Sequence, residues 1–359
     1  MMPPGPAVSA LRRGDKSVSV EPVAVSRPEM PESIETVIQN YGKRIDPLIE
    51  EEFPPDRYPF LSEGARYQLH TGGKRLRPAL CLLTCEGLGG EAEKALPFAC
   101  ASEILHNLFL LHDDIEDGDR KRRDQDTVWV KFGIPNAINI GDFLAAKAYE
   151  VLLKSPVRPE TLIELVKVFT DTYLVTTRGQ ALDINLRASE NLTLEQYLEI
   201  VSLKTARYLA YNMVGGAIVA GAGKEIQDRF WEVGSCLGPA FQIQDDILDL
   251  TKNKGRGGQI GCDIAEGKPT IFLAYLLESR PEAEMRRRLV EILGKPREET
   301  TSEDIQWVIA LYEETGAVEF ARKKAVALAR RAAELVEKIP LSNRELFVKL
   351  CRYVAERRI

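Results

Sequence analysis

Two short acidic motifs offer the clearest chemistry in this sequence, because each places aspartates one helical turn apart. In the first, Asp113, Asp114 and Asp117 follow the apolar run at 108–111. Residues four apart share one face of a helix, so Asp113 and Asp117 should lie next to each other, with Asp114 beside them. Such a like-charged pair destabilises an isolated helix by roughly 0.2–0.5 kcal/mol, and carboxylates near an apolar interior cost far more unless a cation neutralises them. A divalent cation would meet that need.

The same spacing returns in a second apolar helix, at Asp245, Asp246 and Asp249. One such motif alone is also typical of a solvated acidic helix end, but two copies favour a shared site. Oxygen ligands without cysteine or a convincing set of histidines favour Mg²⁺, which takes one or two carboxylates and completes its shell with waters and phosphates. If the two faces oppose each other across a cavity, they form a cage for several Mg²⁺ ions and a highly anionic ligand such as a diphosphate.

Basic residues beside predicted helix ends are candidate phosphate contacts. The segment 71–78 reads Thr-Gly-Gly-Lys-Arg-Leu-Arg-Pro, so its glycines permit a tight turn that places Lys74 and Arg77 near the start of the next helix. Basic side chains and free helix N–H groups together suit a phosphate. The basic run at 120–123 directly follows the first acidic motif and resembles a solvated helix end, yet it would also suit a site that binds Mg²⁺ and phosphate together.

Two more positions point to the same chemistry. Lys204, followed by Thr205, interrupts a long apolar helix, where a lysine is costly unless it meets an anion. His106 lies about two turns before Asp113 and is either a hydrogen-bond donor to a phosphate or a core histidine. With Glu103 it forms the Glu-x-x-His unit of di-iron bundles, but that architecture needs a second copy, which the sequence lacks.

The hydrophobic period predicts one large all-α domain at 31–359, with helices packed round a central cavity. Apolar residues recur every three or four positions in many stretches, and Ser33 is a plausible N-cap of the first helix. Those stretches are 95–112, 136–153, 160–180, 194–221, 225–250, 268–278, 303–315 and 317–338. Residues 1–30 contain several prolines and no sustained period, so we expect a disordered tail there.

The composition excludes several classes of protein. The 359 residues include 48 basic and 54 acidic side chains, and the net charge of −6 argues against a nucleic-acid binder or a polybasic membrane anchor. The six cysteines are scattered and fit reduced core thiols. We find neither an apolar run long enough to insert stably in a membrane nor a signal peptide, and we expect a cytoplasmic protein. Ser and Arg near the N-terminus leave a plastid-type transit peptide open, although Asp15 and Glu21 count against it.

Taken together, these motifs resemble those of the trans-isoprenyl diphosphate synthases, also called polyprenyl synthetases. The two Asp-Asp-x-x-Asp motifs, the Gly-Gly-Lys-Arg-Leu-Arg-Pro segment, Glu-x-x-His, Arg-Arg, Lys-Thr and the Asp-x-x-Glu-Gly-Lys at 263–268 occur in that family's order. The resemblance runs from about residue 33 to residue 357. It implies an all-α isoprenoid-synthase fold, usually a homodimer, that condenses isopentenyl diphosphate head to tail with an allylic diphosphate and releases diphosphate.

The resemblance also implies roles for particular residues. About three Mg²⁺ ions are expected, two bound by Asp113 and Asp117 with support from Asp114, and a third bound by Asp245 with support from Asp246 and Asp249. The positions that match the family's contacts to isopentenyl diphosphate are Lys74, Arg77, His106 and Arg123. Those that match contacts to the allylic diphosphate are Arg122, Lys204 and Lys268. The groups that match those facing the reacting carbons are Thr205 and Gln242.

Three positions depart from the family pattern. Asp124 replaces the glycine that usually follows the two arginines, and Trp129 lies where the family often has histidine. Gly258 replaces a lysine, which removes one cationic contact to the allylic diphosphate.

Two alternatives remain beside the synthase. A terpene cyclase has the same fold and an acidic Mg²⁺ site but needs no second diphosphate pocket, so Lys74 and Arg77 favour the synthase. A non-catalytic subunit of a heteromeric synthase is supported only by Gly258, since both acidic motifs are intact. In this family, side chains just before the first acidic motif limit product length. The bulky Phe109 therefore favours a short chain, C20 geranylgeranyl or C15 farnesyl diphosphate, and we expect C20.

Overall fold

The structure is a computed structural model that describes residue 1 and residues 33–55, 58–251, 259–279 and 281–356. Apart from residue 1, the tail expected at 1–30 lies outside the described residues, and so does the departure at Gly258. Contacts group Ser33–Ile359 into one compact unit. The described part of this unit is almost wholly helical, which confirms the expected all-α class.

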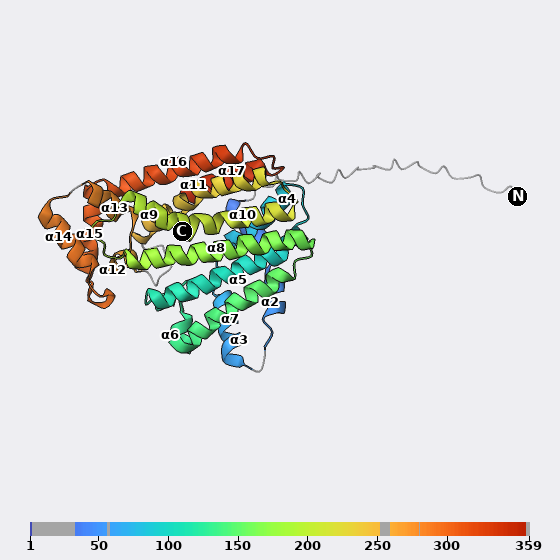
Figure 1. Cartoon of the computed structure of the whole chain (residues 1–359), viewed down its shortest axis with the longest axis horizontal. Coiled ribbons are helices and arrows are strands. Elements are labelled where there is room, and N and C mark those ends of the chain that lie inside the picture. Colours follow the sequence, from blue (N-terminus) through green and yellow to red (C-terminus); the bar gives the residue numbers. More distant parts are fainter. Residues whose placement is uncertain (2–32, 56–57, 252–258, 280, 357–359) are drawn as a thin grey trace. The chain divides into compact units, whose positions relative to one another are not determined.

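In its described residues, the first half of the unit contains eight α-helices and one short hairpin (Figure 1). These are α1 (Ile34–Lys43), α2 (Asp46–Glu52), α3 (Pro59–His70), α4 (Leu76–Gly87), α5 (Ala92–Glu116), β1 (Lys121–Arg122), β2 (Gln125–Asp126), α6 (Val128–Phe132), α7 (Ile134–Leu153) and α8 (Pro159–Asn185). Ser33 caps α1 as predicted, because its side chain accepts a hydrogen bond from the backbone N–H of Thr36 at 3.2 Å.

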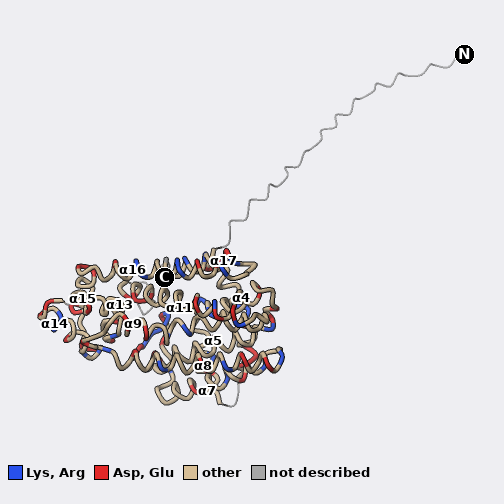
Figure 2. Tube along the Cα trace, turned by 45° about the horizontal axis from the view of Figure 1, so that its top comes forward, with Lys and Arg blue, Asp and Glu red and all other residues tan. Residues whose placement is uncertain are grey.

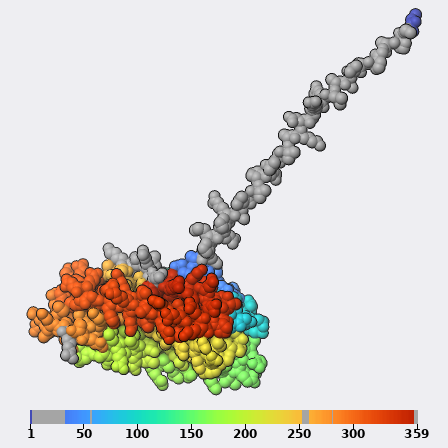
Figure 3. Space-filling view, turned by 90° about the horizontal axis from the view of Figure 1, so that it is seen from above, coloured from blue at the N-terminus to red at the C-terminus, as the bar shows by residue number. Residues whose placement is uncertain are grey.

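The second half continues with helices of several kinds. They are α9 (Leu194–Val201), the π-helix η1 (Ser202–Ala206), α10 (Arg207–Val219), α11 (Lys224–Asp249), α12 (Cys262–Ala265), α13 (Ile271–Glu278), α14 (Ala283–Leu293), the 3₁₀-helix η2 (Arg297–Glu299), α15 (Ser302–Glu314), α16 (Ala317–Val336) and α17 (Arg344–Glu356). The helices α16 and α17, red in Figure 3, occupy the central part of the face seen there.

Packing of the long helices builds the core. The helix α5 packs against α4 and α7, while α10 packs against α4, α8 and α11, and α16 covers α11. One buried apolar cluster joins α4, α5, α7, α10 and parts of α11 and α17, and a second joins α9, α13, α14, α15 and α16. Acidic and basic positions are interspersed along the helices (Figure 2), which suits a surface without a strong bias of sign. No helix in the described ranges is both long and apolar enough to cross a membrane.

A close helix crossing brings the second acidic motif near Lys204. On α11, Gly234 and Gly238 face Ala210 and Ala206, and a β-carbon added at Gly238 would lie 2.2 Å from the α-carbon of Ala206. Only small residues permit two backbones to approach so closely. The end of α11 is therefore held against the segment that contains Lys204.

Two local features differ from the sequence prediction. The stretch predicted as one helix over 194–221 is interrupted by η1, and the basic run at 120–123 enters a hairpin instead of ending a helix. In that hairpin Arg123 and Asp124 have φ of 51° and 64°. A two-residue turn of type I′ needs positive φ at both positions, so Asp124 adopts a conformation that glycine adopts more readily.

Candidate active site

A cavity of about 530 Å³ lies between the two acidic motifs. The carboxylates of Asp113 and Asp117 at the end of α5 and those of Asp245 and Asp246 on α11 line it. The predicted basic and polar residues that also line it are Lys74, Arg77, His106, Arg122, Arg123, Lys204, Thr205, Gln242 and Lys268. Only Asp114 and Asp249, among the predicted site residues, are not part of the lining.

Asp114 and Asp249 instead hold other site residues in place. Asp114 is 1% exposed and accepts hydrogen bonds from Arg122, at 2.7 Å from Nε, with Nη2 at 2.6 Å. Burial raises the pKa of Asp114 to about 7, although the neighbouring Arg122 acts in the opposite direction. Asp249, also buried, accepts a hydrogen bond from the backbone N–H of Asp263 at 2.9 Å and so anchors the start of α12.

The carboxylate of Asp246 accepts hydrogen bonds from two side chains. The hydroxyl of Tyr197 donates to Oδ2 at 2.9 Å, and the Gln242 side-chain amide donates to Oδ1 at 3.1 Å. The hydroxyl of Thr205 in turn donates to the Gln242 Oε1 at 2.9 Å. This chain of hydrogen bonds fixes which side of the Gln242 amide is the acceptor.

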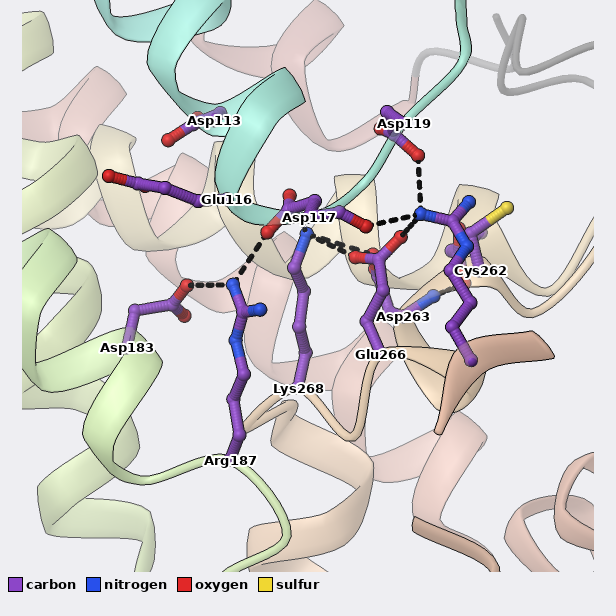
Figure 4. A network of polar contacts seen from close by, with 12 residues as sticks. Asp113, Glu116, Asp117, Asp119, Asp183, Arg187, Cys262, Asp263, Glu266 and Lys268 are labelled. Carbon is purple, nitrogen blue, oxygen red and sulfur yellow. Dashed lines mark hydrogen bonds and ion pairs between the residues drawn. The ribbon is translucent and has the colours of Figure 1, made fainter. Parts of the chain in front are cut away.

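Asp117 lies between two cations (Figure 4). Its Oδ2 is 2.7 Å from Nζ of Lys268, and its Oδ1 is 2.5 Å from Nη2 of Arg187. Burial opposes ionisation of this carboxyl, but Lys268 and Arg187 outweigh it and hold the pKa of Asp117 below its usual range. Asp117 is therefore ionised at neutral pH, as a metal ligand must be.

The π-helix η1 brings Lys204 into the cavity. A π-helical turn is wider than an α-helical one and often occurs at functional sites. The ammonium of Lys204 lies 3.2 Å from Oδ2 of Asp183 and 4.0 Å from Oδ1 of Asp113. Burial lowers the pKa of Lys204, but these two carboxylates raise it overall, so the side chain is a fixed positive charge in the cavity.

A second group of basic residues lies around the loop between α3 and α4. Nη1 of Arg77 donates to Nε2 of His106 at 3.1 Å. Because a guanidinium only donates, the imidazole accepts through Nε2 and is neutral. Burial, together with Arg77, lowers the pKa of His106 well below its usual value.

Arg123 depends on a glycine in that loop. Its Nη1 donates to the carbonyl of Gly72, and a β-carbon added at Gly73 would lie 2.8 Å from its Nη2. Gly73 also has φ of 131°, which strongly favours glycine. The paired glycines noted in the sequence therefore make room for Arg123, and Lys74 beside them lies 3.1 Å from the Tyr353 hydroxyl.

Sequence reasoning missed two residues that shape the site. Arg187 pairs with Asp117, and its only sequence signal is the position four residues after Asp183 on α8. Tyr197, which holds Asp246, has no distinguishing signal, because one aromatic in an apolar helix is ordinary core. Trp129, which departs from the family pattern, makes a local contact: its indole N–H donates to the Asp119 carbonyl at 2.8 Å.

The donor set fits a hard divalent cation. Carboxylate oxygens of Asp113, Asp117 and Asp245 line one cavity, and no cysteine is among its described lining residues. Oxygen-only donors suit Mg²⁺ better than softer metals.

Comparison with known proteins places the chain in a class that shares this helical fold. The crystal structure of geranylgeranyl pyrophosphate synthetase from Pyrococcus horikoshii Ot3 superposes with a TM-score of 0.82 at 31% identity, covering 90% of this chain and 98% of that one. A short chain isoprenyl diphosphate synthase from Methanothermobacter thermautotrophicus is 34% identical over 323 residues, which are 89% of this chain and 98% of the relative. A geranylfarnesyl diphosphate synthase from Aeropyrum pernix is 34% identical over 312 residues, covering 84% of this chain and 95% of the relative.

The sequence pattern of the polyprenyl synthetase family matches residues 58–312. The chain belongs to this family, which confirms the resemblance drawn from its motifs.

The neutral state of His106 predicts a pH dependence of stability. Its pKa is lower in the folded than in the unfolded chain, so the unfolded chain binds more protons below pH 6.5 and the folded state loses stability as pH falls. We expect His106→Gln to lose less stability than the unaltered protein between pH 7.5 and 5.5, by about 1 kcal/mol, since one pH unit corresponds to about 1.4 kcal/mol. Urea unfolding at both pH values measures this difference. Equal losses in the two proteins would contradict it.

Proposed function

We propose that this protein is a prenyltransferase that condenses isopentenyl diphosphate head to tail with an allylic diphosphate, giving a short-chain isoprenyl diphosphate. The observation that supports this most is the presence of two cation groups on one cavity. Lys204, Lys268 and Arg122 lie beside the acidic motifs, whereas Lys74, Arg77 and Arg123 lie around the loop between α3 and α4. A reaction that joins two diphosphate esters needs two such groups.

We assign the part of the cavity that the two acidic motifs line to the allylic diphosphate. About three Mg²⁺ ions, held by Asp113, Asp117 and Asp245, would supply Lewis-acid neutralisation of the leaving diphosphate. Lys204 and Lys268 are charged groups fixed on the same side, and they favour departure of that anion by stabilising its developing charge. Arg122 is held for the same purpose by the buried Asp114.

The remaining residues bind isopentenyl diphosphate or face the carbon–carbon bond that forms. Lys74, Arg77 and Arg123 bind the diphosphate of isopentenyl diphosphate, and His106 orients Arg77 through its Nε2. Gln242, fixed by Thr205, faces the reacting carbons. The departed diphosphate then accepts the proton that the product loses, so no protein nucleophile is needed. Aromatic side chains such as Tyr208 exclude water, which would otherwise capture the allylic cation.

The two alternatives make different demands on this cavity. A terpene cyclase needs no second diphosphate pocket, so the cation group around Lys74 and Arg77 counts against it. A non-catalytic subunit rests on Gly258, which lies outside the described residues.

The experiment that tests this proposal supplies both substrates. Purified protein with Mg²⁺, labelled isopentenyl diphosphate and separate C5, C10 and C15 allylic diphosphates should give one discrete product, sized after dephosphorylation. Asp113→Ala and Asp245→Ala should each lower kcat by at least about 100-fold, because a lost metal ligand removes charge stabilisation in the transition state. Asp171→Ala on α8, a carboxylate outside the cavity lining, provides the control. Absence of product with every primer would refute the synthase and favour a non-catalytic subunit. Product formed from an allylic diphosphate without isopentenyl diphosphate would instead favour a cyclase.

Product length depends on how deep the cavity is beyond the first acidic motif. Phe109, one turn before Asp113 on α5, packs edge to face against Tyr173 on α8 and Tyr208 on α10, with ring centroids 5.5 and 5.3 Å away. These three packed rings form the floor of the cavity beyond Asp113, and two of them, Phe109 and Tyr208, line the cavity directly. We therefore propose a C20 product, with C15 as the alternative.

Removal of this floor should lengthen the product. We expect Phe109→Ala to shift the main product by at least one C5 unit, because the vacated space admits further isoprene units. Product sizing from the same primers measures the change. Phe143→Ala on α7, whose ring packs on Phe53 outside the cavity lining, is the control and should leave product length unchanged. An unchanged product in Phe109→Ala would show that the floor lies elsewhere.

We further propose that the protein is a homodimer that pairs through α7 and α8. Large apolar side chains are exposed on both helices, including Ile134 and Ile138 on α7 and Ile163 and Leu174 on α8, at 46–56%. Exposed apolar residues gathered on adjacent helices are typical of a protein–protein interface.

Charge on this surface should disrupt the dimer. We expect Ile138→Glu to weaken self-association at least about tenfold, because the buried carboxylate would lack a partner. Sedimentation equilibrium measures the dissociation constant. Val326→Glu on α16, which is 54% exposed, should associate as the unaltered protein does. A monomeric unaltered protein would contradict the proposal.

A further inference from the structure

Three buried carboxylates lie close together where α5 and α12 end, and one of them, Asp117, also lines the cavity. Asp117, Asp119 and Glu266 each offer an oxygen within 4.8 Å of the others, and their side chains are at most 3% exposed (Figure 4). Asp117 and Asp119 follow α5, and Glu266 follows α12. Such a group of buried negative charges is stable only if cations are placed within it.

The chain itself supplies those cations. Nη1 of Arg297, in η2, lies 2.8 Å from Oδ1 of Asp119 and 2.9 Å from Oε1 of Glu266. The same nitrogen donates to the backbone carbonyl of Asp117 at 2.7 Å. Nζ of Lys268 lies on the other side, 2.6 Å from Oε2 of Glu266 and 2.7 Å from Oδ2 of Asp117.

Arg297 thereby connects the end of α5 to the loop that contains Lys268. The last carbonyls of a helix have no partner within the helix, and Arg297 satisfies that of Asp117 just after α5 ends. Arg297 also holds Glu266, which in turn pairs with Lys268. The loop itself is confined, because a β-carbon at Gly267 would lie 2.4 Å from the carbonyl oxygen of Leu293, at the end of α14.

Arg297 does not line the cavity, so its effect must pass through other residues. Two of these, Asp117 and Lys268, face the same diphosphate in the function proposed above. A change in their separation would weaken both the metal site and the anion site at once. The cation group around Lys74 and Arg77 contacts α5 farther back, where Arg77 meets His106 about three turns before Asp117, and we expect it to move less than Asp117 and Lys268 do.

We propose that Arg297 is a positioning residue that sets the placement of Asp117 relative to Lys268 and so determines the affinity for the allylic diphosphate with its Mg²⁺. This inference rests on the proposed prenyltransferase function. An arginine suits the position because its guanidinium stays charged, and its Nη1 reaches all three acceptors.

The test compares Arg297→Met and Arg297→Lys with the unaltered protein. Substitution of a residue that orients a metal ligand commonly costs 10- to 100-fold in metal affinity or activity. For Arg297→Met we therefore expect the KM for the allylic diphosphate and the half-saturating Mg²⁺ concentration each to rise about tenfold, while the KM for isopentenyl diphosphate changes less than about twofold. Arg297→Lys should recover part of the loss, because it restores the charge.

A second readout does not depend on turnover. Inorganic diphosphate with Mg²⁺ should raise the melting temperature of the unaltered protein more than that of Arg297→Met. Arg287→Met, on the exposed face of α14, removes the same charge and should behave as the unaltered protein. If Arg297→Met does not fold, Asp119→Asn removes one contact of Arg297 and should produce the same selective change to a smaller degree.

The outcomes separate this inference from the function on which it rests. Equal changes in both KM values, or none, in an active protein would overturn the role of Arg297 alone. An equal melting-temperature increase with diphosphate in Arg297→Met would do the same. An unaltered protein that makes no product with any primer would instead overturn the proposed function.

Discussion

Neutralisation of buried carboxylates is the constraint on which the rest of this structure depends. Asp114 is matched by Arg122, Asp117 by Lys268 and Arg187, Asp183 by Lys204, and Glu266 by Arg297. Each cation comes from a different element, so the electrostatic requirement of one helix end fixes the position of several others. Removal of one partner from a buried ion pair is far more costly than removal of an exposed one. The folded chain therefore brings together α5, α8, η1, α12 and η2 around one acidic centre.

The pairing has a further effect on binding. Three of these cations, Arg122, Lys204 and Lys268, are also the ones proposed to bind the allylic diphosphate, so contacts within the protein hold them at the site. Lys268 contacts both Asp117 and Glu266, and it must exchange part of these contacts for phosphate oxygens. Glu266 retains Arg297 during that exchange, which keeps the loop in place. Prior organisation of this kind lowers the entropic cost of binding.

Much of the fold and the site could be predicted from sequence because spacing along one helix is a local property. Apolar residues that recur every three or four positions predict the long helices. The i, i+4 spacing likewise predicts that Asp113 lies beside Asp117. The β1–β2 hairpin was not predicted, since its turn residues, Arg123 and Asp124, lack the usual glycine or asparagine. Likewise Arg187 and Arg297 lie 70 and 180 residues from Asp117, and no local pattern connects residues so far apart.

The hairpin has a consequence for how the two substrates are kept apart. Arg122 ends β1 and reaches Asp114, whereas Arg123 lies in the turn, with φ of 51°, and reaches the carbonyl of Gly72. In the proposed assignment, one peptide unit therefore forms the boundary between donor and acceptor. The backbone positions from which the two arginines extend are then a fixed covalent distance apart, about 3.8 Å between their α-carbons. A residue inserted between Arg122 and Arg123 would therefore separate the two diphosphate contacts that this peptide unit joins.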